Sequence, residues 1–382
     1  MAAVPTMQTG LAALQRGDAA TAAAQFEALR QAGGGADVCL ALAFARVHLE
    51  DAAGALSAVD LALEQEPRNL RALLFKADHL DRMGRSRQAL GFYQASLQVG
   101  VNMGTELPQD VRQGLGRAQA QSDRYAREYE QHLRKALHKA GYGDGNCPRF
   151  AESLDILGGH TPVYFQQPTR YLFPGLTQAA FFPREQFPWL AQLEAQSGAI
   201  REELRAVLEG DESFSPYLEL DPHSPQLNDV DNVGSMDWSA FYLWQDGEPV
   251  AANAARCPRT MQALAAVPAP SVPGQTPTAL FSRLKPGVRI PPHNGMVNTR
   301  LICHLPLVVP ANCGALRVGN YTRPWVEGEG FVFDDSIEHE AWNDSDAERV
   351  VLLFDIWRPE LSEEERRWVS ELLQAVDAFV ED

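Results

Sequence analysis

The chain has 382 residues, more than one ordinary hydrophobic core accommodates, which predicts two domains. Its formal net charge of −17 produces a surface that repels nucleic acids and anionic lipids, so binding to either is disfavoured. The N-terminus lacks a basic stretch followed by an apolar core, and no later run approaches about eighteen apolar residues, which favours a cytoplasmic protein away from membranes. Five cysteines form no CxxC pair, so we expect reduced thiols rather than a zinc site.

A helical repeat occupies the first hundred residues. Ala22, Ala55 and Ala89 fall in register 33 and 34 residues apart, and an aromatic or branched residue follows each of them four positions later. Small residues at such positions let paired helices approach closely. The period resembles that of the tetratricopeptide repeat over residues 5–100, with a generic helical bundle as the alternative. A further helix over 109–140 is expected to cap the repeats and complete a domain at 1–140.

From about residue 145 the chain becomes rich in proline, aromatic residues and short β-type runs such as FYLWQ, TRLICHLPLVV and ERVVLLFDIW. This texture predicts an antiparallel jelly roll, a double-stranded β-helix, over residues 141–382. Two flanking helices are expected, one around residues 188–210 and one after Pro359, where Ser362 and Glu365 form a capping box. One apolar face of the last helix comprises Trp368, Leu372, Val376 and Phe379.

Three of the nine histidines lie within or beside predicted strands, namely His293, His304 and His339. A jelly roll brings sequence-distant strands together around an open interior, so His293 and His339 are expected to meet there. Neutral imidazole is a suitable ligand for Fe(II).

Arg349 begins the apolar strand ERVVLLFDIW, whose composition predicts burial on both faces. A buried guanidinium needs a partner, and a small-molecule carboxylate bound through two hydrogen bonds would provide one. An ion pair with a nearby acid, Asp334 or Asp335, is the structural alternative, and the pattern alone does not separate the two.

The stretches HNGMVNTRLICHLPLVVP and GFVFDDSIEHEAWNDSDAERVVLLFDIWRPEL resemble the signature region of the aspartyl/asparaginyl β-hydroxylase family. The match includes the ten-residue offset between His339 and Arg349. A weaker likeness continues upstream, so that the resemblance spans residues 165–360. It implies a dioxygenase that depends on Fe(II), 2-oxoglutarate and O2, hydroxylates its substrate and releases succinate and carbon dioxide.

The resemblance also implies a role for individual residues. His293 and His339 match the two iron ligands of the family. Arg349 matches an arginine that pairs with the distal carboxylate of 2-oxoglutarate, and Ser282 matches a serine that helps to hold it. His304 matches a histidine near the other end of the cosubstrate.

Five further positions carry weaker or divergent signals. Trp238 is a weaker match, expected in the pocket wall. Many 2-oxoglutarate oxygenases place a carboxylate ligand two residues after the first histidine, but here that residue is Gly295, so water is expected in its place and Asp335 is the less favoured substitute. Family members commonly carry an arginine where this chain has Ile302, whereas Arg300, on the same strand face, is expected to serve the catalytic site.

The favoured hypothesis is β-hydroxylation of an Asp or Asn residue in a peptide or protein, with the repeats binding the substrate or a protein partner. A free amino acid or another small molecule is the alternative substrate. A lipid substrate is less favoured without a membrane segment. From a different class, a non-catalytic adaptor is disfavoured because His293, His339 and Arg349 are all present.

Overall fold

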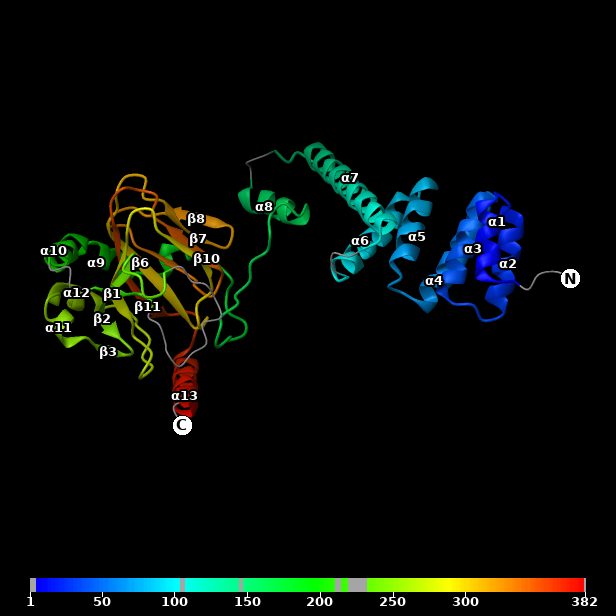
Figure 1. Cartoon of the computed structure of the whole chain (residues 1–382). Helices are drawn as coiled ribbons and strands as arrows, with labels where there is room; N and C mark the ends of the chain where they lie inside the picture. The colour runs from blue at the N-terminus through cyan, green and yellow to red at the C-terminus, as the bar shows by residue number, and fades with distance from the viewer. Residues whose placement is uncertain (1–4, 104–106, 144–146, 210–213, 219–231, 381–382) are drawn as a thin grey trace. The chain divides into compact units, whose positions relative to one another are not determined.

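The computed structural model describes residues 5–103, 107–143, 147–209, 214–218 and 232–380 (Figure 1). The chain divides into two compact units, Met1–Gly158 and Gly159–Asp382, so the division lies later than the boundary expected after residue 140. The reason is that α8 (Pro148–Leu157) packs on α7 (Gln109–Lys139), where Arg134 pairs with Asp155 at 3.7 Å.

The described residues before α7 contain six helices in three consecutive pairs, in keeping with the repeat in the sequence. Their bounds are α1 (Met7–Gln15), α2 (Ala19–Gln31), α3 (Ala36–His48), α4 (Ala52–Gln65), α5 (Leu70–Arg82) and α6 (Ser86–Val101). The aligned residues Ala22, Ala55 and Ala89 are all fully buried. At Gly10 an added Cβ would overlap the ring of Phe26, so α1 and α2 pack closely only because this residue has no side chain.

Polar side chains define where several of these helices begin. Asp18, Asp51 and Asn69 each accept a hydrogen bond from the backbone N–H three residues later, at 2.8–3.0 Å. Each bond satisfies one of the backbone donors that a helix leaves unpaired at its N-terminus. Among the described residues no helix is both long enough and apolar enough to cross a bilayer.

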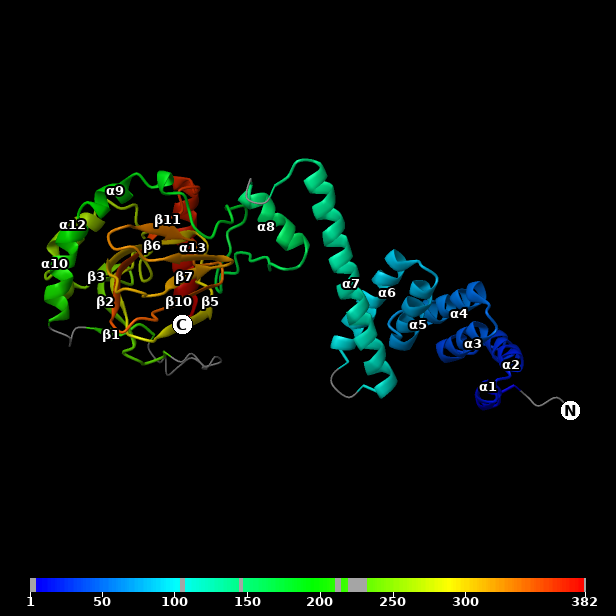
Figure 2. The same ribbon diagram turned by 90° about the horizontal axis from the view of Figure 1, so that it is seen from above.

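The second unit contains two antiparallel sheets flanked by helices (Figures 1 and 2). The strands are β1 (Ser215–Pro216), β2 (Trp238–Gln245), β3 (Glu248–Pro249), β4 (Ala279–Leu284), β5 (Arg289–His293), β6 (Arg300–Val308), β7 (Ala315–Val318), β8 (Tyr321–Pro324), β9 (Phe331–Phe333), β10 (His339–Trp342) and β11 (Arg349–Trp357). The larger sheet has the order β1-β2-β4-β11-β6-β9, with β3 paired to β2, and the smaller has the order β5-β10-β7-β8. The chain therefore crosses repeatedly from one sheet to the other.

Both faces of the larger sheet are buried. Along β11, Val350, Leu352 and Phe354 join a cluster with the outer helices, whereas Val351 and Leu353 point to the cluster between the sheets. The helical elements of this unit before α13 are η1 (Arg184–Gln186), α9 (Trp189–Glu194), α10 (Ser197–Leu208), α11 (Ala251–Ala254) and α12 (Pro258–Leu264). Figure 2 shows α9, α10 and α12 along the outer side of the sheet. Alternate residues of β11 thus pack against the outer helices, and the residues between them face the space between the two sheets, where a site can form.

The last helix, α13 (Glu363–Val380), begins with the expected capping box, since Ser362 N–H donates to Glu365 at 2.8 Å and Glu365 N–H donates back at 3.3 Å. Val369 and Leu373 make its buried contact. The apolar face noted in the sequence is instead between 38% and 84% exposed, at Trp368, Leu372, Val376 and Phe379.

Candidate functional site

Two histidines face each other where the smaller sheet pairs β5 with β10. His293 ends β5 and His339 begins β10, the two are register partners, and their ring centroids lie 4.1 Å apart. Each Nδ1 lies 2.8 or 3.1 Å from the carbonyl oxygen two residues earlier in the chain. A carbonyl can only accept, so each Nδ1 carries the proton and each Nε2 keeps a free lone pair.

Burial keeps both imidazoles neutral. It lowers the pKa of His293, and burial together with the neighbouring His293 lowers the pKa of His339 to about 3. The neutral ring is the form that binds a metal ion. The Nε2 lone pairs of the two neutral rings can therefore bind a divalent cation.

A carboxylate side chain does not fit at the position two residues after His293. A Cβ added to Gly295 would overlap the carboxylate of Asp335, and Gly295 N–H donates to the Asp335 carbonyl at 2.7 Å. In the described part of the chain, no third His, Cys, Asp or Glu joins the two histidines in a metal-binding group. The side chain of Asp335 pairs instead with Arg300 at 3.5 Å. Two histidines with open positions are the donor set that this region offers.

Gly295→Ala should lower the free energy of unfolding by about 1–3 kcal/mol, because the new methyl group overpacks against Asp335. Urea denaturation measures this change. Gly198→Ala in α10 is the matched control, since nothing lies within 4 Å of its added Cβ. Equal stability of the two variants would contradict the close approach of Asp335 to Gly295.

At the start of β11, the guanidinium of Arg349 is buried, and no acid among the described residues pairs with it. Arg349 is 1% exposed, its Nη1 donates weakly to the Ser282 carbonyl at 3.5 Å, and its guanidinium lies 4.6 Å from the ring centroid of Trp325. Its Nε has no hydrogen-bond partner in the structure as described. Burial lowers the pKa of Arg349 to about 10, so the group still carries its charge at neutral pH.

Neither nearby acid pairs with this guanidinium. Asp334 forms a fully buried ion pair with Arg358, and Asp335 pairs with Arg300. The alternative of an ion pair between Arg349 and Asp334 or Asp335 is therefore wrong. A buried, hydrogen-bond-deficient cation is costly unless an anion completes it, and this geometry fits a small-molecule carboxylate.

The residues beside Arg349 form a polar and aromatic frame. Trp238 Nε1 donates to the hydroxyl of Ser282 at 3.3 Å, and its ring stacks on Tyr217 with centroids 4.0 Å apart. Trp325 Nε1 donates to His304 Nδ1 at 3.3 Å. His304 is neutral because burial and the charge of Arg349 hold its pKa well below the ordinary value, so its Nε2 carries the proton and is a donor.

A cavity of about 640 Å³ brings these groups together. The seven site residues expected from the sequence all line it: Trp238, Ser282, His293, Arg300, His304, His339 and Arg349. Ile302, Asp335 and Asp355 line it as well.

The charge of Arg300 is already compensated. Its Nη1 lies 3.3 Å from Asp355 and its Nη2 lies 3.5 Å from Asp335. Asp355 was not singled out in the sequence, although a lone carboxylate in the apolar run VVLLFDIW was an available signal. Tyr217 and Trp325 were also missed, and neither has a comparable local pattern.

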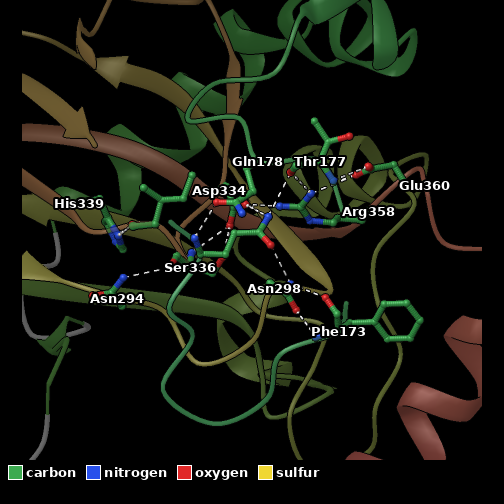
Figure 3. A network of polar contacts seen from close by, with 12 residues as sticks. Phe173, Thr177, Gln178, Asn294, Asn298, Asp334, Ser336, His339, Arg358 and Glu360 are labelled. Carbon is green, nitrogen blue, oxygen red and sulfur yellow. Dashed lines mark hydrogen bonds and ion pairs between the residues drawn. The ribbon is translucent and has the colours of Figure 1, made fainter. Parts of the chain in front are cut away.

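A second polar network holds the turn before His339 in place (Figure 3). Asp334, fully buried, pairs with Arg358 and accepts hydrogen bonds from Ser336 N–H at 3.0 Å and from Gln166 at 2.8 Å. Asn294 donates to the carbonyl of Ser336 at 2.9 Å. This network links the residue after His293 to the turn that leads into His339, so it fixes the spacing of the two rings.

Comparison with known proteins shows which family this region resembles. Residues 194–359 match the family model described as aspartyl/asparaginyl beta-hydroxylase. An ornithine lipid ester-linked acyl 2-hydroxylase of Rhizobium tropici is 37% identical over 176 residues, which cover 45% of this chain and 58% of that protein. The human aspartyl/asparaginyl beta-hydroxylase is 37% identical over 131 residues, or 34% of this chain and 17% of the relative.

A third relative, aspartate beta-hydroxylase domain-containing protein 2 of Xenopus tropicalis, is 32% identical over 206 residues, covering 53% of each chain. This chain thus spans less than two thirds of the length of each of these relatives. Among solved structures, the Sgt2 TPR domain from Aspergillus fumigatus is 19% identical and covers 32% of this chain and 85% of its own, with a TM-score of 0.27. The TPR2B domain of yeast Sti1 is 23% identical and covers 29% of this chain and 91% of its own, with a TM-score of 0.26.

Proposed function

We propose that the second unit, whose residues 194–359 belong to the aspartyl/asparaginyl beta-hydroxylase family, is a hydroxylase that depends on Fe(II) and 2-oxoglutarate. The observation that carries this proposal is the juxtaposition, in one cavity, of two neutral histidines and a buried arginine that pairs with no described acid. We assign the two sheets as a jelly roll, since β4 to β11 distribute four strands to each sheet with crossings between them.

In this proposal His293 and His339 would hold the iron through their Nε2 atoms, and water would take the place of the carboxylate ligand that Gly295 does not provide. Arg349 pairs with the distal carboxylate of 2-oxoglutarate, while the hydroxyl of Ser282 adds a hydrogen bond. When bound, the metal and cosubstrate supply the chemistry that uses O2 to hydroxylate the substrate, with release of succinate and carbon dioxide.

The chain's own residues orient the reactants and protect them from solvent. The backbone carbonyls behind both histidines hold the rings in one tautomer, so the lone pairs stay aimed at the same point. The indole of Trp325 covers Arg349 and donates to His304, which leaves the proton on His304 Nε2 available to a polar atom of the cosubstrate. The apolar walls limit the access of water, which strengthens each charge-assisted contact.

Two substrate classes remain in this proposal. The family name favours an Asp or Asn side chain of a peptide or protein, and the tetratricopeptide-like repeats of the first unit are a candidate platform for it. The second class is a small molecule that bears no carboxylate at the reacting end, and compensation of Arg300 by two acids favours it. The Rhizobium tropici relative is named for a lipid substrate, which adds amphiphilic amines to this class.

The proposal is tested by loading the full chain with Fe(II) anaerobically and adding 2-oxoglutarate and O2 with a panel of peptides, amino acids and amphiphiles. Succinate formation and a product heavier by one oxygen atom support it. Failure of the metal-loaded protein to bind 2-oxoglutarate would exclude it and favour a non-catalytic adaptor.

A fragment of residues 159–382 should bind iron and 2-oxoglutarate as the full chain does, because every cavity residue lies in the second unit. Titration of both proteins measures this directly. If the repeats bind a protein substrate, the fragment should also show a raised Michaelis constant for that substrate with unchanged cosubstrate affinity. Hydroxylation of a protein substrate by the fragment at full efficiency would assign the repeats to another partner.

A further inference from the structure

One wall of the cavity has more carboxylates than cations. Arg300 lies between Asp355 and Asp335, at 3.3 and 3.5 Å, and all three side chains line the cavity. Two acids thus face a single guanidinium, and the wall carries a formal excess of one negative charge. We call these three residues the acidic wall.

The acidic wall also has an unused acceptor. Asp335 is 5% exposed, and its Oδ1 is buried without a hydrogen-bond partner among the described residues. An unpaired buried carboxylate oxygen costs free energy that a bound donor recovers. A ligand donor that reaches this oxygen would therefore recover that free energy.

Asp355, at one end of the acidic wall, lies far along the sheet from the arginine assigned to the cosubstrate. Arg349 and Asp355 lie on the same strand, β11, six residues apart, which at about 3.3 Å per residue is roughly 20 Å. Arg349 is the only other arginine or lysine among the described cavity-lining residues. Position 302, next to the wall on β6, carries an isoleucine and adds no compensating charge. The excess negative charge therefore stays at the end of the cavity away from Arg349.

The acidic wall continues toward a smaller cavity of about 240 Å³. Tyr217, Thr278, Met296 and Arg300 line both cavities, and Asp246 lines only the smaller one. Asp246 is exposed, so a further carboxylate stands on this side of the site. The carboxylates Asp246, Asp335 and Asp355 thus line this side of the two adjoining cavities.

We propose that the acidic wall binds a cationic amine of the substrate and rejects a carboxylate, so that the substrate is an amine-bearing molecule rather than an acidic side chain. This inference rests on the proposed hydroxylase function and names its substrate class. An ammonium group donates to Asp335 and balances the excess charge, whereas a carboxylate would be desolvated beside two like charges.

The test uses the full chain loaded anaerobically with Fe(II) and 2-oxoglutarate, and three probes of equal chain length: hexylamine, hexanamide and hexanoate. Calorimetric titration at low salt should give a dissociation constant for hexylamine at least about tenfold below that for hexanoate. The selectivity ratio is the dissociation constant for hexanoate divided by that for hexylamine. Asp355→Asn should reduce this ratio about tenfold, and Arg300→Gln should increase it. Any direct contact of a probe with the metal is common to parent and variants, so the change in ratio isolates the wall.

Glu327→Gln is the matched control, because it removes one negative charge from an exposed ion pair with Arg201 outside the cavity. Its ratio should equal that of the parent. The inference is overturned if hexanoate binds the parent as tightly as hexylamine, or if hexylamine does not bind. Should Asp355→Asn fail to fold, Arg300→Gln provides the test. An unchanged or smaller ratio of the hexanoate to the hexylamine dissociation constant in that variant refutes amine binding by the acidic wall. Titration with 2-oxoglutarate alone is a separate arm, and its failure counts against the hydroxylase proposal instead.

Discussion

His339→Ala and His293→Ala should each abolish iron binding and, with it, succinate release. The described residues offer two metal-binding side chains at this point, so no other ligand compensates for the loss of one. Changes in residues that merely orient a ligand cost about 10–100-fold in metal affinity, and loss of a ligand should exceed that range. Anaerobic titration with Fe(II), followed by a cosubstrate turnover assay, measures both effects.

His132→Ala is the control for these variants, because His132 is an exposed residue of α7 in the first unit. It should bind iron as the parent does. Iron binding at the parental level by a folded His339→Ala protein would refute the assignment of the ligands.

Arg349→Ala should weaken the binding of 2-oxoglutarate by about 2–5 kcal/mol, the scale for losing one partner of a buried charge pair. Affinity for iron should change little, because Arg349 does not contact the histidine pair through any hydrogen bond or ion pair of the described structure. The 2-oxoglutarate affinity of Arg349→Lys should lie between those of the parent and of Arg349→Ala, since an ammonium keeps the charge but cannot form the bidentate contact. Titration of the iron-loaded protein with 2-oxoglutarate measures the loss.

A stability measurement separates this role from a structural one. Arg349 is buried and pairs with no acid in the described part of the chain, so Arg349→Met should stabilise the ligand-free protein by up to about 1–4 kcal/mol while it removes cosubstrate binding. The exposed Arg289→Gln, which removes a surface pair with Asp344 and a contact with the ring of Trp342, should change both properties little. Destabilisation by Arg349→Met together with unchanged 2-oxoglutarate affinity would make the arginine a structural residue.

Sequence patterns predicted much of the fold because most of its elements have local signals. The 33- and 34-residue spacing of Ala22, Ala55 and Ala89 marked the helix pairs, and the apolar run after Arg349 marked a strand buried on both faces. The site residues were found through their resemblance to a family motif, and the structure places them around one cavity. Their roles as ligands stay predictions.

What the sequence did not reveal depends on strand register. The contact of Arg300 with Asp355 exists because β6 and β11 pair with Asp355 opposite Ile302 and Trp357 opposite Arg300. A shift of one residue would turn Asp355 to the other face of the sheet. No local pattern specifies this pairing, so the neutralisation of Arg300 and the acidic wall were visible only in three dimensions.

The hydrogen bonds behind the two histidines determine the proton balance of metal uptake. Because both imidazoles are already neutral, with Nδ1–H held by a backbone carbonyl, a divalent ion arriving at neutral pH has no proton to displace from either ring. In acid, the histidines must instead lose their protons when the chain folds, and this lowers the stability of the folded state. Unfolded imidazoles take up protons below about pH 6.5, whereas the folded pKa of His339 is about 3, so acid destabilises the fold through this residue as pH falls below 6.5. The apparent affinity for the metal should therefore stay nearly constant with pH around neutrality, and acid should act on the site chiefly by unfolding its scaffold.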